Sequence, residues 1–240
     1  MSVATAAMLT VACGSGGATG AQTGASAESH KPASAIVNDA QSCLSAAHSV
    51  HVHAELELPD GSHTIDVDTR ANGDATGTTS GPSGTIEVIL IGHGADAGGR
   101  TYVNAAAGFW GNYVSQASAA ALANTWVMIP SSSAPDEAAA GVAEFTAYPS
   151  LASSLTPGGA AASFGRATTP DGRASIKLSE GGVFLFVSDS PAPCPLYVLD
   201  TATAGGQGTG HLAFSRYNSG PRITPPAQAT ALPAQAAPGP

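Results

Sequence analysis

The chain has 240 residues, of which 43% are hydrophobic, 5% are aromatic and only 10% are charged, and its formal net charge is −9. It contains eight Lys and Arg residues in all and no basic cluster, so it lacks the positive patch that nucleic-acid binding requires. The same deficit argues against electrostatic attraction to anionic lipids, so any membrane attachment must come from an anchor. The length suits a single domain between two low-complexity tails.

The N-terminal segment resembles a secretory signal that ends at a cysteine. Residues 1–12 contain a short apolar run, and the small residue Ala12 precedes Cys13. We interpret Cys13 as the acceptor of a lipid anchor, which would place the rest of the chain at the extracytoplasmic face of the cell membrane. The alternative is a cysteine that stays free or is removed. Because the apolar run lacks a preceding basic region, the natural chain could start further upstream.

Composition divides the chain into four segments. After the signal at residues 1–13, residues 14–33 are rich in Gly, Ala and Ser and predict a flexible linker. Residues 34–223 hold the periodic patterns and form the predicted folded domain. Residues 224–240 are rich in Pro and Ala and predict a disordered or extended tail. Apolar residues at helical spacing within 36–47 indicate an amphipathic helix near the start of the domain.

Alternation of apolar and polar residues dominates the rest of the domain and predicts about ten strands. Val50 and Val52 fall on one face of the first strand, whereas His51 and His53 fall on the other. One side of the sheet is therefore expected to be apolar and the other polar. The expected strands are 49–58, 62–70, 75–80, 85–92, 100–105, 125–130, 162–168, 173–179, 183–188, 195–201 and 210–218.

Short helical patterns interrupt this succession of strands, within residues 109–124, 136–148 and 151–155. Turn residues of the Asp-Gly and Asn-Gly type separate consecutive strands, as in an antiparallel meander. We therefore predict an α+β fold that is mainly β: a single antiparallel sheet with a few helices covering one face.

Three histidines near the first strand follow the pattern H-x2-H-x-H. His51 and His53 share a face of the strand, which is compatible with a metal site, but the sequence places no third ligand beside them. His48 lies just before the strand. An exposed polar face explains these histidines equally well, so neither a metal nor another cofactor is assigned.

Cys43 and Cys194 remain once Cys13 is assigned to the anchor. In an exported protein they can oxidise to a disulfide, which would close a loop of roughly 150 residues. The alternative is two buried thiols. The sequence does not decide between the two states, because it does not show whether the sulfurs are within reach of each other.

Motifs of the common catalytic families are missing from the sequence, which has no G-x-S-x-G, no P-loop and no H-E-x-x-H. Gly206, Gly208 and Gly210 resemble a nucleotide-binding loop in composition, but they lie between two expected strands and no helix follows them. The sequence therefore predicts a protein that is not an enzyme.

A sheet with one apolar face under weakly hydrophobic, Ala-rich helices would leave room between the two layers. The alternative is an ordinary packed core. Because successive strand residues point to opposite faces, an error of one residue in the register of a strand would place the neighbouring residues, instead of the chosen ones, on the face that lines this space. The apolar side chains that we expect to line this space are Val88, Leu90, Val103, Trp126, Met128, Phe145, Leu155, Phe184 and Phe186.

The order of several segments resembles one family of envelope proteins. A tethered cysteine and a helix are followed by SAAHSVHVHAELEL (45–58), RTYVNAAAGFWGNYV (100–114) and NTWVMIP (124–130), as in the LppX/LprA/LprF/LprG lipoproteins of Gram-positive envelopes. The resemblance covers residues 33–226. Further matches to the family's progression of motifs are Gly165, Asp171-Gly172, Pro195-Leu196, Phe214-Ser215, Tyr217-Asn218 and Pro225-Pro226.

The resemblance implies a LolA-like fold, in which a half-open antiparallel barrel surrounds helices on its concave face and encloses a cavity for acyl chains. It implies a membrane-anchored lipoprotein that binds or carries lipids or lipoglycans, with an envelope transport partner that it does not specify. Of the individual functional residues, Cys13 alone carries over. Two other functions stay open: a surface-interaction or sensor-accessory lipoprotein without a lipid cavity, and a metal-binding lipoprotein that uses His51 and His53.

Overall fold

The structure, a computed structural model, describes residues 27–92, 99–130, 139, 141–154, 162–201 and 209–233. Cys13 and Leu155 lie outside these residues. Across the described ranges, no helix combines the length and apolar character needed to cross a bilayer.

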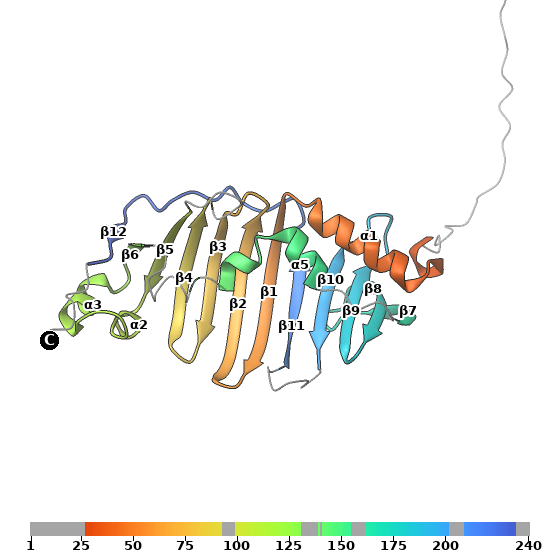
Figure 1. The fold of residues 1–240 in the computed structure, drawn as a ribbon, viewed down its shortest axis with the longest axis horizontal. Helices are drawn as coiled ribbons and strands as arrows, with labels where there is room; N and C mark the ends of the chain where they lie inside the picture. The colour runs from red at the N-terminus through yellow and green to blue at the C-terminus, as the bar shows by residue number, and fades with distance from the viewer. Residues whose placement is uncertain are drawn as a thin grey trace, which may run out of the picture.

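A single sheet forms most of the molecule and consists of two antiparallel meanders (Figure 1). The first meander contains β1 (Ser49–Leu58), β2 (Gly61–Arg70), β3 (Ala75–Gly81), β4 (Gly84–Ile91), β5 (Arg100–Ala105) and β6 (Trp126–Ile129). The second contains β7 (Ala162–Thr168), β8 (Ala174–Glu180), β9 (Val183–Ser188), β10 (Pro195–Asp200) and β11 (Thr209–Ser215). Strands β1 and β11 pair antiparallel and join the two meanders. With the short strand β12 (Thr230–Ala231), the order is β12-β6-β5-β4-β3-β2-β1-β11-β10-β9-β8-β7.

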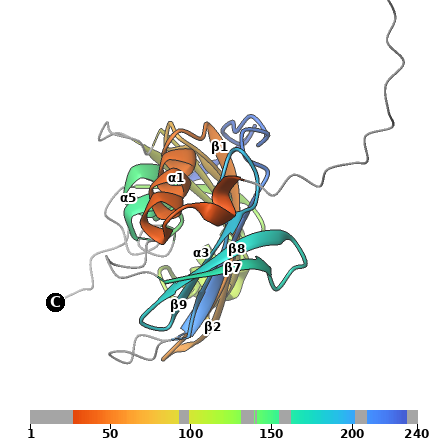
Figure 2. The ribbon, with the colours of Figure 1, turned by 90° about the vertical axis from the view of Figure 1, so that its right-hand side faces the viewer.

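The helices are short and lie against this sheet. Figures 1 and 2 show α1 and α5 on the same face of the sheet, and α2 and α3 beside its β5–β6 end. A 3₁₀ turn precedes α1, and residues 141–144 are also helical. The bounds are Ala27–His30 for the 3₁₀ turn, Ala33–Ser45 for α1, Ala107–Trp110 for α2, Gln116–Leu122 for α3 and Tyr148–Ser154 for α5.

Alternate residues of the strands build one continuous core on the side that α1 and α5 cover, which we call the helix-covered face. In β1 these are Val50, Val52 and Ala54, each 0% exposed. Val67 and Phe214 lie opposite Val52 in the neighbouring strands and are equally buried, since paired residues point to the same face. The helices contribute to the same core cluster, with Ile36, Val37, Ala40 and Leu44 from α1 and Tyr148, Leu151 and Ala152 from α5.

A disulfide between Cys43 and Cys194 fastens α1 to the sheet. Cys43 lies in α1 and Cys194 directly precedes β10, and their Cα atoms are 5.2 Å apart. The backbone N–H of Cys194 donates to the hydroxyl of Ser188 at 3.0 Å, and the N–H of Ser188 donates to the carbonyl of Cys194 at 2.9 Å. The cysteine on the sheet side is therefore held in place by the end of β9.

The prediction of a mainly β fold with one unclosed sheet of about ten strands is confirmed: the described residues form 12 strands, and eleven of them match the expected ranges. The additional strand is β12, which pairs parallel with β6 and makes the sheet mixed. It belongs to the segment that the sequence assigned to a disordered or extended tail. Thr230 and Ala231 pair with Val127 and Met128, and the N–H of Leu232 donates to the carbonyl of Met128 at 3.2 Å. Residues 230–232 therefore extend the sheet edge, because their backbone finds hydrogen-bond partners there.

Two tyrosines carry phenol groups whose ionisation the fold opposes. Tyr148 in α5 is 1% exposed, and its hydroxyl lies 3.0 Å from the hydroxyl of Thr69. Burial raises the pKa of Tyr148, and the hydrogen bond with Thr69 offsets this only in part. The hydroxyl of Tyr217 donates to the carbonyl of Pro195 at 2.7 Å, and burial raises the pKa of Tyr217 strongly.

These tyrosines predict a loss of stability at alkaline pH. Each holds its proton more tightly in the folded than in the unfolded chain, so its contribution is complete below the ordinary tyrosine pKa of about 10 and is lost as the pH rises above it. Each adds a slope of up to about 1.4 kcal/mol per pH unit to the free energy of unfolding. Urea denaturation of the parent and of a Tyr148→Phe, Tyr217→Phe variant, from neutral to alkaline pH, measures this. Equal alkaline slopes in the two proteins would contradict the prediction.

Candidate functional site

The structure divides the predicted lining residues between the two faces of the sheet. Val88, Leu90 and Val103 are buried on the helix-covered face, each at most 1% exposed. Phe145 joins the same core cluster from the segment that precedes α5 and is 9% exposed. These four residues lie in the core between sheet and helices, and their role as the lining of a cavity stays a prediction. Leu155 lies outside the described residues.

The other four predicted lining residues lie on the opposite face of the sheet, and this part of the prediction is corrected. Val127 pairs with Val103 in the core, so its neighbours Trp126 and Met128 point away from the helices. Likewise Leu185 belongs to the core cluster, so Phe184 and Phe186 point to the other side. Their strands are apolar on both faces, and the alternation therefore gave no register.

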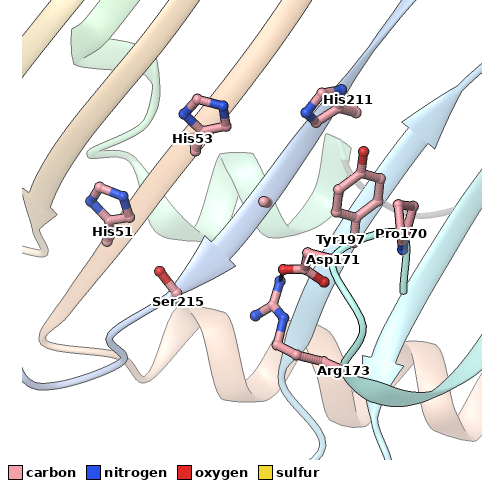
Figure 3. A pocket seen from close by; sticks show the side chains of 9 residues that line it. His51, His53, Pro170, Asp171, Arg173, Tyr197, His211 and Ser215 are labelled. Atoms are coloured by element: carbon pink, nitrogen blue, oxygen red, sulfur yellow. Dashed lines mark ion pairs between the residues drawn. The ribbon is translucent and has the colours of Figure 1, made fainter. Parts of the chain in front are cut away.

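A polar cluster occupies the centre of the face opposite the helices, where the two meanders meet (Figure 3). We call this cluster the histidine face, and it consists of His51, His53 and Glu55 of β1, Tyr197 of β10 and His211 of β11. Glu55 pairs with His211 across the β1–β11 junction, so the two side chains share a face. Sequence reasoning had singled out His51 and His53 but missed Glu55 and His211.

His51 is engaged with charged neighbours on one side of this cluster. Its Nδ1 lies 3.3 Å from Oδ1 of Asp68 and is hydrogen-bonded with the guanidinium of Arg216. Arg216 Nη2 also lies 2.9 Å from Oδ1 of Asp68. His51 therefore belongs to a three-membered network with a cation and a carboxylate.

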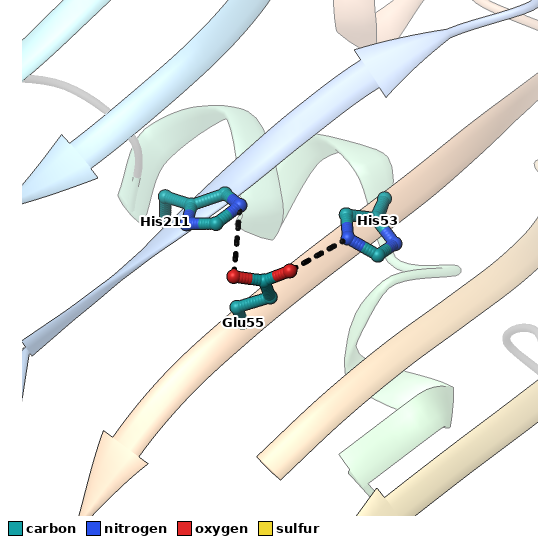
Figure 4. A group of neighbouring side chains, drawn as sticks. All are labelled: His53, Glu55 and His211. Carbon is teal, nitrogen blue, oxygen red and sulfur yellow. Dashed lines mark hydrogen bonds and ion pairs between the residues drawn. The ribbon is translucent and has the colours of Figure 1, made fainter. Parts of the chain in front are cut away.

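His53 and His211 both face Glu55 (Figure 4). Nε2 of His53 lies 3.5 Å from Oε1 of Glu55, and Nε2 of His211 lies 3.9 Å from Oε2. Nδ1 of His53 lies 3.1 Å from Oδ2 of Asp66, on the neighbouring strand β2. These ligand atoms of His53, Glu55 and His211 all lie within 4.8 Å of one another.

Tyr197 and Gly210 position His211. The rings of Tyr197 and His211 are stacked, with centroids 5.0 Å apart and an interplanar angle of 12°. A Cβ atom at Gly210 would lie 2.6 Å from the carbonyl oxygen of Glu55, so the close approach of β11 to β1 requires glycine there. Burial raises the pKa of Tyr197, and the carboxylates of Glu55 and Asp171 raise it further.

Arg173 lines one side of the cluster and connects the turn between β7 and β8 to strands β10 and β11. Its guanidinium donates to the carbonyls of Phe214 at 2.6 Å and Leu196 at 2.8 Å, and forms an ion pair with Asp171 at 2.7 Å. Desolvation acts to raise the pKa of Asp171, but hydrogen bonds from Thr169 and Arg173 and the charge of Arg173 outweigh it and lower that pKa. Arg173 is thus held by structural contacts.

Two grooves flank the imidazole of His211. One has a volume of about 400 Å³ and includes His51, His53, Tyr197 and Arg173 in its lining. The other has a volume of about 330 Å³ and is lined in part by Glu55, Glu57 and Asp200. Solvent and small ions therefore reach the His53–Glu55–His211 group from both sides.

Comparison with solved structures places this architecture among known folds. LprF from Mycobacterium bovis aligns with a TM-score of 0.55 and 18% sequence identity, over 81% of this chain and 96% of LprF. The chain has an LprF-like fold. The lipoprotein LppX from Mycobacterium tuberculosis aligns with a TM-score of 0.48 and 15% identity, over 80% of this chain and 100% of LppX. No protein-family model and no curated protein matches the sequence.

The resemblance that the sequence motifs indicated is thus confirmed at the level of the fold. In this LprF-like fold, the helix-covered face supplies a broad apolar layer, and the histidine face supplies ionisable groups on the other side of the same sheet. The two candidate sites are separated by the thickness of the sheet, so they can be tested independently.

Proposed function

We propose that this protein is a lipid-anchored lipoprotein of the cell envelope that binds the acyl chains of a lipid or lipoglycan between its sheet and its helices. The observation that supports this proposal is the extent of the helix-covered face. Its apolar residues run from Val127 in β6 to Ile176 in β8 and are covered by short helices such as α1 and α5. The Cys43–Cys194 disulfide fastens α1 to the sheet, whereas the seven-residue α5 can be displaced more readily than a second sheet, because so short a helix makes few interactions of its own.

Small side chains increase the room that this layer offers to an apolar ligand. Ala54, Ala75 and Ala105 lie in the core on the sheet side, and Ala40 and Ala152 lie there on the helix side. An acyl chain that enters between the layers would gain about 0.8 kcal/mol for each methylene removed from water. Binding of a chain of ordinary lipid length is therefore strongly favoured once the layers separate.

The anchor belongs to the same proposal. Lipidation of Cys13 would hold the domain on the outer side of the membrane, within reach of lipids that leave the bilayer. One acyl chain gives marginal, reversible attachment, so stable anchoring needs more than one chain. The proposal requires no catalytic group.

Native mass spectrometry of the protein purified from its own host, or from a lipid-rich expression host, tests this function. We expect a bound species whose mass corresponds to a lipid and which disappears after delipidation. The delipidated protein should then take up a fluorescent fatty-acid probe. A protein that is ligand-free and takes up no acyl probe would contradict the proposal and favour a surface-interaction lipoprotein of the same fold.

Two tryptophan substitutions in α5 locate the site of uptake. Ala152 is buried in the core cluster, whereas its neighbour Ser153 is exposed. Ala152→Trp fills the apolar layer, and excluding two methylenes should weaken probe binding by roughly tenfold. Ser153→Trp adds the same side chain on the solvent side and should leave probe binding unchanged. Equal effects of the two variants would place the acyl site elsewhere.

A further inference from the structure

The group formed by His53, Glu55 and His211 lies on the face of the sheet opposite the core. The three side chains come from the two strands that join the meanders, and His211 lies opposite Glu55 across that junction. Their side chains are 34%, 60% and 22% exposed, respectively. We propose that His53, Glu55 and His211 form a binding site for a divalent transition metal ion, with zinc as the best-matched ion.

The geometry of the three ligand atoms fits such an ion. Zinc binds imidazole nitrogen and carboxylate oxygen at about 2.0–2.2 Å, which puts neighbouring ligands of a tetrahedral site about 3.4 Å apart. The distance from His53 Nε2 to Glu55 Oε1 is 3.5 Å, and that from His211 Nε2 to Glu55 Oε2 is 3.9 Å. One ligand atom from each residue lies within 4.8 Å of the others, so rotations of the Glu55, His53 and His211 side chains can bring the three groups around one ion.

The surroundings hold both imidazoles in the orientation that a metal requires. The carboxylate of Asp66 lies 3.1 Å from Nδ1 of His53 and can accept a hydrogen bond from it when Nδ1 carries the proton. That tautomer leaves Nε2 free to coordinate the ion. Carboxylate–histidine pairs of this kind fix the tautomer of metal-bound histidine. The stacked ring of Tyr197 restricts the orientation of the His211 ring. The site is thus preorganised by residues that do not touch the ion.

Ligand chemistry selects the class of metal. Two imidazoles and one carboxylate suit zinc, copper or nickel, whereas calcium and magnesium prefer oxygen ligands alone. Three protein ligands leave a fourth position open, and the groove lined by Glu57 and Asp200 reaches it. These two carboxylates favour a cation in this groove. His51 is not counted as a ligand, because the ligand atoms that converge within 4.8 Å are those of His53, Glu55 and His211.

Titration of the full chain with zinc chloride, monitored by calorimetry on protein without a histidine tag, tests the proposal. The parent protein should bind one zinc ion at this site and no calcium. His53→Ala and His211→Ala should each weaken zinc binding by roughly a hundredfold, and Asp66→Asn by about tenfold. Zinc should also raise the melting temperature of the parent, because it links β1 to β11 in the folded state alone, and this increase should vanish in the ligand variants.

His51→Ala is the matched control, since it removes another histidine from the same strand and face. It should leave zinc affinity within about threefold of the parent, because it does not remove a ligand. An equal loss in the His51 and His53 variants, or zinc binding that survives a His53→Ala, His211→Ala double variant, would overturn the proposal. Glu55→Gln keeps the shape of the side chain and provides a second test should either alanine variant fail to fold. Uptake of an acyl probe should be unchanged in all of these variants. A failure of the metal-site proposal can therefore be distinguished from a failure of the proposed lipid-binding function.

Discussion

Replacing both Cys43 and Cys194 by serine is expected to lower the free energy of unfolding by about 2–5 kcal/mol. The disulfide joins residues that are 151 positions apart, and a cross-link across so long a loop strongly restricts the unfolded chain. In the folded protein it also holds α1 against the start of β10. Urea denaturation of the unlipidated full chain measures the loss as a shift of the unfolding midpoint.

Reduction of the parent protein provides the control for this prediction. A reducing agent should move the midpoint of the parent to that of the double serine variant and should leave the variant unchanged. Thiol titration in denaturant should find one reactive thiol, that of Cys13, before reduction and three afterwards, since the chain has three cysteines. Three reactive thiols in the oxidised protein, or a midpoint that reduction does not move, would show that Cys43 and Cys194 are not paired.

Truncation of Phe214 to alanine should cost about 3–5 kcal/mol of stability. Phe214 is 0% exposed, lies opposite Val52 in β11 and belongs to the core cluster. Its strand joins the second meander to the first, so a cavity at this position weakens the contact between the two halves of the sheet. The same urea-denaturation measurement gives the loss.

Phe164 offers a matched control for this substitution, because it is the same residue type at an exposed position. Phe164 is 62% exposed, and Nζ of Lys177 lies 5.8 Å from its ring centroid. Phe164→Ala should change stability by about 0.5 kcal/mol or less. If Phe214→Ala does not fold, Phe214→Leu should still show a measurable loss of about 1 kcal/mol. Similar effects of truncation at the two positions would contradict the assignment of Phe214 to the core.

Prediction from the sequence worked where the pattern was strictly alternating. In β1, apolar residues alternate with histidine and glutamate, and this fixed the strand, its bounds and its buried face together. In β4 the polar Glu87 between Ile86 and Val88 marks the outer face, and Val88 and Leu90 reach the core although Ile89 between them is apolar. One face of such a strand must be buried, so the pattern and the structure leave a single register.

The prediction failed where a strand is apolar on both faces. In β9 every residue except Ser188 is apolar, and in β6 Trp126 and Met128 alternate with residues as hydrophobic as themselves. Burial of either face is then compatible with the local pattern. Pairing with the neighbouring strands determines which face is buried. Strand β12 was missed for a related reason. This two-residue strand forms because the edge of β6 offers free backbone hydrogen-bonding groups, and the residue types of Thr230 and Ala231 do not by themselves predict a strand.

The sequence by itself determined the fold class, the buried face of the alternating strands and the presence of two cysteines available for pairing. These features follow from local periodicity and composition, which act over a few residues. Only the tertiary structure brought His211 to Glu55, paired Cys43 with Cys194 and engaged His51 with Asp68 and Arg216. Each of these contacts joins segments far apart in the chain or depends on a competing ion pair. Such contacts are set by the pairing of β1 with β11 and by the packing of α1, and no local pattern encodes them.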